Sequence, residues 1–331
     1  AQESRGLGDV YKRQVLFITT KNLDYLRNTQ EIEMIKKDGG QLTVIGSYSK
    51  SYVKRLLSVY AKILTTSMRK FDVVFVGFAP QLIFAPFNWK FKKNTVVIDF
   101  FISMYDTIVF DRKKIKDGSL FAKLLKHYDK KAIKAADEII CDTNAHGRYF
   151  VEEFGANRDK MHTLYLEADR SIYYVRNLER PERMKDKYVV LYFGSILPLQ
   201  GIEVILDAID KIKDNKELYF IIVGPIKDEL NKPIADNVEY HNWLSQEELA
   251  EYIDYSDLCL SGHFNKNINK AKRTIPGKAY IYDAMNKKII FGDNPAVREL
   301  YSEDEDKYYF VEMGNPDALA EKIVECSRKR N

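Results

Sequence analysis

The sequence has few residues of the kinds that build disulfide frameworks or metal sites. Only three of its 331 residues are cysteine, an odd number, and two of them, Cys141 and Cys259, lie within apolar runs. This usage predicts buried thiols in a reducing compartment rather than a disulfide-stapled secreted domain. The five histidines show neither HxH nor HExxH spacing. We therefore expect a cytoplasmic protein without a bound metal.

Long apolar segments and common nucleotide-binding motifs are also missing. The longest apolar stretch, residues 73–87, is interrupted by glycine, glutamine and two prolines, which argues against a membrane span. Neither a Walker A loop nor a GxGxxG motif occurs, so neither a P-loop nor a classical dinucleotide site is supported. Low-complexity tracts and short repeats are absent too, which argues against a solenoid or a long disordered tail.

The sequence does contain a regular series of short apolar runs, each followed by a helical pattern. The runs are apolar throughout instead of alternating, which is typical of parallel strands covered on both faces. Helices between them predict right-handed crossovers and therefore an α/β fold. The predicted strands are residues 15–19, 42–46, 72–77, 95–99, 138–142 and 161–166 in the first half, and 188–194, 218–224, 237–241, 257–262, 288–293 and 308–312 in the second.

A charged segment separates the sixth run from the seventh. Residues 167–186 lack apolar periodicity and are rich in Arg, Glu and Asp, which predicts a linker. We expect two Rossmann-like domains, residues 15–180 and 181–331, that face each other across a cleft suited to a two-substrate transfer. Residues 1–14, AQESRGLGDVYKRQ, precede the first strand and do not look native. We interpret them as a non-native leader.

The stretch from residue 270 to residue 300 is the most informative part of the chain. It places a basic cluster, a Pro-Gly turn, a helix with one acid and a buried strand in succession. Such a unit presents backbone N–H groups and cations to a diphosphate. The stretch resembles the "IPxKxYEAMAxGKPVI" run of the nucleotide-sugar site in GT-B glycosyltransferases. Seven residues keep the family's order, with two extra residues between the fourth and the fifth: Ile275, Pro276, Lys278, Tyr280, Asp283, Ala284 and Met285.

Further segments of the second half resemble the GT-B donor domain in the right order. They are YFGSILPLQGIEVILDAI (192–209), FIIVGP (220–225), VEYHNWLSQEELAEYIDYSDLCLSG (238–262) and GNPDALAEKI (314–323). The first half resembles the acceptor domain more loosely, most clearly at residues 136–155. The closest likeness is to retaining bacterial enzymes that assemble surface polysaccharides. The resemblance implies a GT-B fold, with sugar transfer from a UDP- or GDP-sugar to a saccharide or lipid-linked acceptor. It implies no cofactor besides the nucleotide-sugar co-substrate.

The resemblance also implies which residues bind the diphosphate. In most relatives an Arg and a Lys beside the first donor-domain strand do so, but here Ser195 and Gln200 occupy those places and carry no charge. We infer that Arg273 and Lys278 form the clamp instead, since both donate hydrogen bonds to phosphate oxygens. Solvated loop lysines are the alternative. Gly194 follows an apolar strand, where glycine lets the backbone approach a phosphate closely.

The family's spaced pair of acids is only half present. Asp283 takes the place of the acid that accepts hydrogen bonds from the ribose hydroxyls, the alternative being an exposed helix acid. The first acid of the pair would fall at Ile275 and is missing. Its absence raises the rival hypothesis of a catalytically silent, nucleotide-binding partner subunit. A non-hydrolysing nucleotide-sugar epimerase is a second rival, because it shares the fold.

A metal is not expected in the reaction. The run from Asp304 to Asp306 fits the DxD pattern of metal-dependent transferases, but it lies in a wholly acidic loop between a helix and a strand. Without a metal, cations and helix N-termini must meet the charge that develops on the leaving diphosphate. The basic cluster suits that task. Together with the basic cluster, the resemblance to GT-B enzymes implies a metal-independent, hexosyltransferase-type enzyme.

Candidate acceptor-side residues follow the fourth predicted strand. Asp99 and Asp106 lie where polar groups at the carboxyl end of a strand point into a cleft, so either could orient an acceptor hydroxyl as a catalytic residue. The alternative is that they are helix caps and surface acids. Retaining enzymes of this type have no agreed protein nucleophile, and we assign none.

Basic and aromatic residues cluster in two segments of the first half. Residues 15–170 carry 26 Lys and Arg against 18 Asp and Glu. The stretch from Ser51 to Lys70 is amphipathic, and that from Asn88 to Asn94 places Trp and Phe among lysines. Both suit peripheral docking on the inner face of a membrane, as a lipid-linked acceptor would require. A core-packing helix with a solvated back is the alternative. No nucleic-acid-binding motif accompanies the basic residues, so nucleic acid is not an expected partner.

Overall fold

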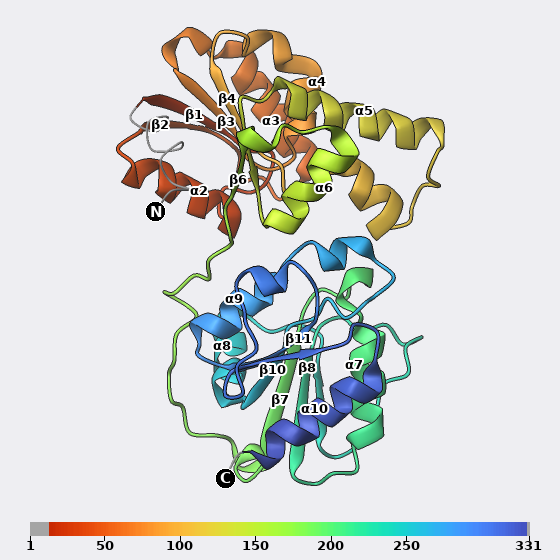
Figure 1. Ribbon diagram of the computed structural model, residues 1–331. Coiled ribbons are helices and arrows are strands. Elements are labelled where there is room, and N and C mark those ends of the chain that lie inside the picture. Colours follow the sequence, from red (N-terminus) through yellow and green to blue (C-terminus); the bar gives the residue numbers. More distant parts are fainter. Residues whose placement is uncertain (1–12, 330–331) are drawn as a thin grey trace. The chain divides into compact units, whose positions relative to one another are not determined.

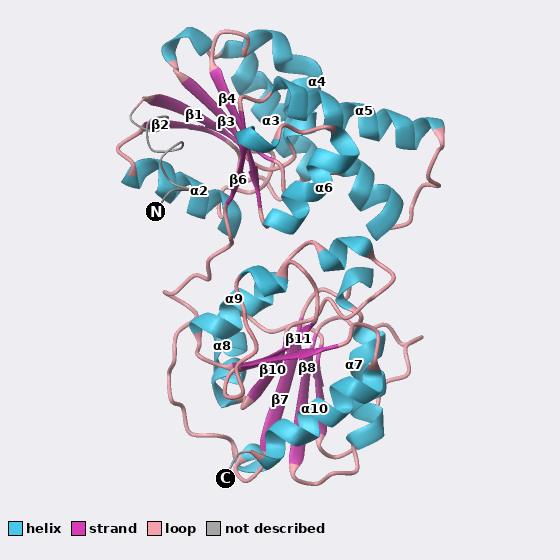
Figure 2. Ribbon diagram, viewed as in Figure 1, coloured by secondary structure: helices cyan, strands magenta, loops and turns pink. Residues whose placement is uncertain are grey.

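The computed structural model describes residues 13–329, which form two compact units. One unit ends at Leu166, the other begins at Glu167, and each contains a six-stranded parallel sheet (Figures 1 and 2). The sequence prediction of twelve strands is confirmed, since each predicted run overlaps one strand of these sheets. The α/β class and the division into two Rossmann-like units are confirmed with it.

The first unit alternates strands and helices along the chain. Its strands are β1 (Gln14–Ile18), β2 (Gln41–Ile45), β3 (Val73–Val76), β4 (Thr95–Asp99), β5 (Glu138–Cys141) and β6 (Met161–Thr163), in the sheet order β2-β1-β3-β4-β5-β6. Its helices are α2 (Leu26–Lys37), α3 (Tyr52–Thr65), α4 (Pro80–Phe87), α5 (Leu120–Ala135) and α6 (Asn144–Phe154). A π-helix, Asp106–Asp111, lies between β4 and α5.

Both faces of the first sheet are covered, as its uniformly apolar strands predict. Alternate residues of β1 serve opposite faces: Val15 and Phe17 pack in the cluster that includes Ile35 of α2, whereas Leu16 and Ile18 pack on the other side. Residues of α3, α4, α5 and α6 share that second cluster, so these four helices cover one face of the sheet.

The second unit repeats the architecture with a different strand order. Its strands are β7 (Tyr188–Phe193), β8 (Leu218–Val223), β9 (Val238–His241), β10 (Leu258–Leu260), β11 (Lys288–Gly292) and β12 (Tyr308–Val311), in the order β12-β11-β10-β7-β8-β9. Its helices are α7 (Ile202–Ile212), α8 (Gln246–Tyr255), α9 (Gly277–Ala284) and α10 (Pro316–Arg328). Residues of α7 and α10 share one apolar cluster with the strands, while α8 contacts β7 and α9 contacts β11.

The strand order reverses between β7 and β10. The chain runs outward from β7 through β8 to β9, and then returns to place β10 on the other side of β7. The chain therefore continues from β7 toward β8 on one side of this point and from β10 toward β11 on the other. In open parallel sheets, ligands bind at such a topological switch point.

The predicted linker packs against the second unit. The backbone N–H groups of Arg176 and Leu178 donate to the Asp254 carboxylate over 2.9 and 2.8 Å, and Arg180 Nη2 lies 2.7 Å from Asp257 Oδ1. These contacts explain why the units divide after Leu166, whereas the sequence places the boundary after residue 180.

Three other sequence predictions concern the chain as a whole. Cys141, Cys259 and Cys326 are buried free thiols, as expected. Within residues 13–329, no helix is both long and apolar enough to cross a membrane. Most of the predicted leader lies outside the described residues, but Gln14 is the first residue of β1.

Candidate functional site

Two glycines border the switch point of the second sheet. Gly194 follows β7, and Gly262 follows β10 with a φ of +82°, a backbone conformation that other residues rarely adopt. A Cβ atom added at Gly262 would lie 2.2 Å from Gln200 Oε1 and 2.9 Å from Lys278 Nζ. One added at Gly194 would lie 3.2 Å from the same Nζ. Glycine therefore lets both loops close over the Lys278 side chain.

Lys278 provides a buried cation at this edge. It is the second residue of α9 and only 6% exposed, and its Nζ donates to Gln200 Oε1 and lies 4.9 Å from the centre of the Tyr192 ring. Burial lowers its pKa to about 7, since desolvation disfavours the charged form. No ion pair to Lys278 is recorded among the described residues. The ammonium group thus has a neutral amide as its hydrogen-bond acceptor, and an anion would supply the missing charge.

Gln200 is held in place by contacts between two loops. It ends a short 3-10 helix, Pro198–Gln200, and its carbonyl accepts from the Phe264 N–H over 3.1 Å. Asn265 Nδ2 donates to the Pro198 carbonyl over 2.9 Å. The loops after β7 and β10 are therefore tied together beside Lys278. The structure thus brings together three of the predicted donor-site residues: Gly194, Gln200 and Lys278.

Ser195 and Arg273 lie in the two loops that flank this group. Ser195 is exposed directly after Gly194. Arg273 is half-buried and follows the short 3-10 helix Asn269–Lys272, which packs against the helix that contains Gln200. Leu199 and Ala271 join these helices in one buried apolar cluster. Arg273 therefore lies in the loop next to Gln200, and its role as a second phosphate contact stays a prediction.

Asp283 lies on another side of α9. It follows Lys278 by five residues, a rotation of roughly 140° around an α-helix. Its Oδ1 accepts from Lys307 Nζ over 2.8 Å and from the Tyr308 hydroxyl over 2.5 Å. Burial opposes ionisation, but these two hydrogen bonds outweigh it and keep the pKa of Asp283 below its usual value. The chain thus supplies the partners of this carboxylate, and ribose binding by Asp283 stays a prediction.

Sequence reasoning missed two residues of the group around Lys278. In the sequence, Tyr192 begins one segment that resembles the GT-B donor domain and Gly262 ends another, but neither is predicted to be a site residue. The Tyr192 hydroxyl is buried and has no hydrogen-bond partner among the residues that the structure describes. A Cβ at Gly194 would lie 3.2 Å from it, which places this hydroxyl beside the same loop. The available signal was the position of both residues at the carboxyl ends of adjacent strands.

Asp99, a predicted catalytic residue, is part of a buried ion pair in the first unit. Arg27 Nε and Nη2 lie 2.8 and 3.0 Å from its two carboxylate oxygens, and Asp99 itself is fully buried. Glu31 lies 3.7 Å from the same Arg27 Nε. Burial, reinforced by the nearby Asp99 charge, raises the pKa of Glu31 well above its usual value. One guanidinium group therefore faces one carboxylate and a second acid that burial favours in its neutral form.

Asp106, the other catalytic candidate, is also buried. It begins the π-helix, and its backbone N–H donates to Ser103 Oγ over 2.9 Å. The same Ser103 hydroxyl donates to Asp129 of α5, which also accepts from Gln81 Nε2, with both distances 2.7 Å. Contact of either candidate with an acceptor stays a prediction.

The described residues offer little for a metal ion. No group of three or more His, Cys, Asp and Glu side chains within residues 13–329 could hold one. Asp304 and Asp306 of the predicted DxD-like run are exposed, and the N–H of Asp306 donates to Asp304 Oδ1 over 2.9 Å.

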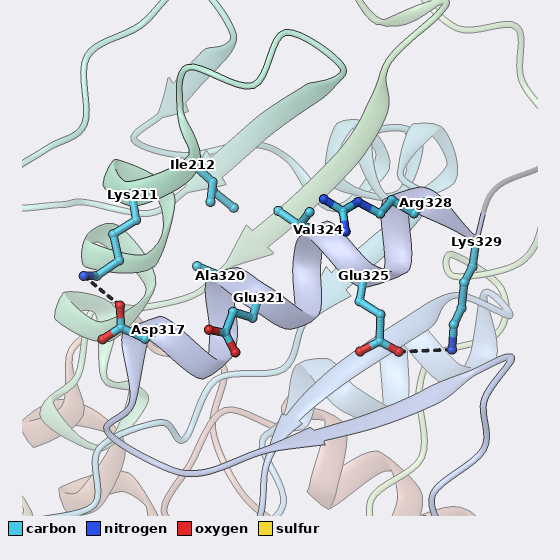
Figure 3. Close-up of a pocket in the computed structure, with 9 residues that line it drawn as sticks. All are labelled: Lys211, Ile212, Asp317, Ala320, Glu321, Val324, Glu325, Arg328 and Lys329. Atoms are coloured by element: carbon cyan, nitrogen blue, oxygen red, sulfur yellow. Dashed lines mark ion pairs between the residues drawn. The ribbon is translucent and has the colours of Figure 1, made fainter.

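A surface groove elsewhere in the second unit shares no residue with this site. It has a volume of 580 Å³ and lies between the carboxyl end of α7 and α10 (Figure 3). Four of its charged side chains form two ion pairs: Lys211 Nζ lies 2.8 Å from Asp317 Oδ1, and Lys329 Nζ lies 3.1 Å from Glu325 Oε1. We interpret it as the furrow between two packed helices.

Comparison with known proteins places this geometry in a family context. Residues 187–329 match the family model "Glycosyl transferases group 1". An uncharacterized 41.2 kDa protein in the cps region of Klebsiella pneumoniae is 26% identical over 219 residues, which cover 63% of this chain and 58% of that protein. The chitobiosyldiphosphodolichol beta-mannosyltransferase of Candida albicans is 25% identical over 54% of this chain and 43% of its own length. The chain thus spans about half the length of these curated relatives.

Solved structures resemble nearly the whole chain. Anabaena HepE, solved in complex with UDP, superposes with a TM-score of 0.64 at 11% identity, over 96% of this chain and 90% of that one. Sucrose-phosphate synthase from Thermosynechococcus elongatus gives a TM-score of 0.66 at 12% identity, over 95% and 89%. The chain therefore has the fold of GT-B glycosyltransferases, and its second unit matches the group 1 glycosyl transferase family.

Proposed function

We propose that this protein is a metal-independent, retaining glycosyltransferase that moves a hexose from a UDP- or GDP-sugar to a saccharide acceptor, free or carried on a lipid. The reaction would serve bacterial surface polysaccharide synthesis. Support for the donor comes from the group 1 match of the second unit and from HepE, which has also been solved with UDP-glucose. Support for the pathway comes from the relative in the cps region.

The observation that carries the proposal is the buried Lys278 ammonium at the switch point. A desolvated cation without an acidic partner is unfavourable in the empty protein, and a diphosphate would relieve that cost. The glycines after β7 and β10 leave the backbone free to approach phosphate oxygens. The same cation would stabilise the negative charge that develops on the diphosphate as the sugar leaves, which is the main catalytic need without a metal.

Thermal unfolding in the presence of UDP-, GDP-, ADP- and dTDP-sugars tests the donor site. A ligand at about 100 times its dissociation constant should stabilise the folded state by about 2.7 kcal/mol. We expect stabilisation by the UDP or the GDP class and its loss in Lys278→Met. Gln200→Ala should weaken it, since Gln200 orients the ammonium group. No stabilisation of the well-folded protein by any of the four would overturn the proposed site.

Turnover separates a transferase from a silent partner subunit. The nucleotide class that binds is incubated with extracted lipid-linked and free saccharides, and release of the nucleoside diphosphate is measured. Acceptor-dependent release is expected. Binding without release would favour the silent subunit, a reading that the buried apolar Ile275, at the position of the missing acid, keeps open.

A further inference from the structure

The amino end of α5 presents large apolar side chains to solvent. Leu120 is 87% exposed, Phe121 53% and Leu124 43%, all within five positions of one another. Phe110, at the other end of the preceding loop, is 40% exposed. Leu125, by contrast, faces the core of the first unit, so the helix has an inner apolar face and a separate outer one. Such a set of exposed apolar side chains indicates an interaction surface.

The same segment carries mostly positive charge at its surface. Residues 112–131 contain eight Lys and Arg and two Asp, and the preceding Asp111 is buried and lies 3.8 Å from Arg112 Nε. Among residues 110–131, Asp117 is the one exposed acid. Asp129 is fully buried, and Asp117 accepts a 2.7 Å hydrogen bond from the Tyr105 hydroxyl. Most of the cations remain available, because the part of the chain that the structure describes records no ion pair to Lys113, Lys114, Lys116, Lys123, Lys130 or Lys131.

The base of this surface is held in a fixed conformation. Asp129 accepts hydrogen bonds from the backbone N–H groups of Met104 and Tyr105 over 3.1 and 2.9 Å. The Ser119 hydroxyl caps the helix by accepting from the Ala122 N–H over 3.2 Å. The exposed side chains are therefore displayed on an ordered scaffold, and little ordering is needed when they bind.

We propose that the α5 tip, defined as residues 110–124, docks on an anionic lipid bilayer. Leu120, Phe121 and Leu124 would enter the boundary between headgroups and acyl chains, while the lysines around them contact lipid phosphates. The positive charge selects an anionic surface. The exposed apolar side chains select a bilayer over a dissolved anionic polymer, which has no apolar interior to receive them.

This surface differs from the one that the sequence predicts. In the predicted surface, residues 51–70 and 88–94, three cationic side chains donate hydrogen bonds to backbone carbonyls of the protein itself. Arg55 is buried and donates to the Thr20 carbonyl over 2.8 Å, Lys62 binds the Gly46 carbonyl over 2.8 Å, and Lys90 binds the Ile63 carbonyl over 2.6 Å. The α3 surface still exposes Leu57 and Leu64, so it provides a matched control of similar apolar character.

Site-specific fluorescence tests the proposal. The three native thiols are buried, so a cysteine introduced at Leu120→Cys or Leu57→Cys can be labelled selectively with an environment-sensitive NBD probe. Vesicles of phosphatidylcholine, alone or mixed with phosphatidylglycerol, are then added without any sugar nucleotide. We expect a blue shift of the probe at residue 120 on the mixed vesicles only, no shift at residue 57, and reversal by salt.

Co-sedimentation with the same vesicles measures the affinity. The double variant Leu120→Ser with Phe121→Ser should lose roughly ten-fold or more, since both apolar anchors are removed. Leu57→Ser with Leu64→Ser should bind like the original protein. All four positions are exposed, so unchanged melting temperatures should show that the variants fold. Three outcomes would overturn the proposal: no binding to mixed vesicles, a shift at residue 57 alone, or binding to dextran sulfate with no shift on vesicles. Failure of the sugar-transfer assay would not affect this result.

Discussion

The carboxyl edges of the two sheets treat buried charge in opposite ways. In the first unit, Arg27 and Asp99 form a buried ion pair with two hydrogen bonds. In the second, Lys278 is almost as buried and has the amide oxygen of Gln200 as its hydrogen-bond acceptor. The first arrangement is internally balanced, whereas the second lacks an anion. If Lys278 binds the donor as proposed, charge imbalance, more than burial, distinguishes the ligand site from the structural ion pair.

The largest change in stability is expected when the buried ion pair of the first unit is broken. Arg27→Met would leave the Asp99 carboxylate buried without its cation, and we expect a loss of roughly 3–5 kcal/mol in the free energy of unfolding. Urea denaturation followed by circular dichroism measures it. The double variant Arg27→Met with Asp99→Leu should lose less, because it leaves no buried charge from the pair. A single variant as stable as the double would contradict our interpretation.

The next effect concerns the glycine over Lys278. Gly262→Ala adds a Cβ in strained backbone and within 2.2 Å of Gln200 Oε1, so we expect a loss of roughly 2–3 kcal/mol and weaker nucleotide binding. Gly118→Ala is the matched control. Gly118 has a similar φ of +76°, and nothing lies within 4 Å of its added Cβ. Equal losses in the two variants would mean that close approach at Gly262 is unimportant.

A smaller change, a gain in stability, is expected when the unpaired charge of Lys278 is removed. Lys278→Met should stabilise the empty protein by about 1–2 kcal/mol at pH 7 while abolishing nucleotide binding, because an apolar chain replaces a desolvated cation. The pKa of Lys278 is about 7 in the folded protein and higher when unfolded. Between pH 7 and 10 the unfolded chain therefore binds more protons than the folded protein, so the original protein becomes more stable as the pH rises. The difference in unfolding free energy between the variant and the original protein should shrink over this range. A variant less stable than the original across this range would refute the comparison.

The smallest change in stability is expected at Asp283, where a structural role and a ligand-binding role can be told apart. Its ion pair with Lys307 is partly exposed, so Asp283→Ala should cost only about 0.5–1 kcal/mol in unfolding. Lys307→Met removes the same pair and serves as the control. If Asp283 binds ribose, nucleotide affinity measured by calorimetry should fall in Asp283→Ala but persist in Lys307→Met. Unchanged affinity in both would assign the residue a structural role.

The fold could be predicted from the sequence because its signal is local. Each strand is a short apolar run, and β4 (Thr95–Asp99) has the same bounds in the prediction and in the structure. The proposed donor site was only partly predictable. Motif order identified Lys278, Gln200 and Gly194, which the structure brings together. The pairing of Asp283 with Lys307 joins residues 24 positions apart and depends on how α9 is rotated against β12, which no motif records.

Long-range polar contacts account for the other differences. The amphipathic segment that forms α3 has apolar residues on two faces, since Ile63 is buried and Leu57 is 62% exposed. Arg55 lies on the buried side because three oxygens, the Thr20 and Ser49 carbonyls and the Asn22 side chain, receive its guanidinium group. A helical wheel assigns arginine to solvent and cannot anticipate such acceptors.

The segment that joins the units has a consequence for dissecting the protein. Residues 176–180 resemble a linker in sequence but belong to the second unit. Arg176 and Leu178 donate hydrogen bonds to Asp254, and Arg180 donates one to Asp257. A fragment that starts at residue 181 would expose an edge of α8 and leave both carboxylates without these donors. One that starts at Glu167 keeps them. Recombinant production of the second unit alone should therefore begin at Glu167, and a protease that cuts between the units should leave residues 176–180 attached to the second.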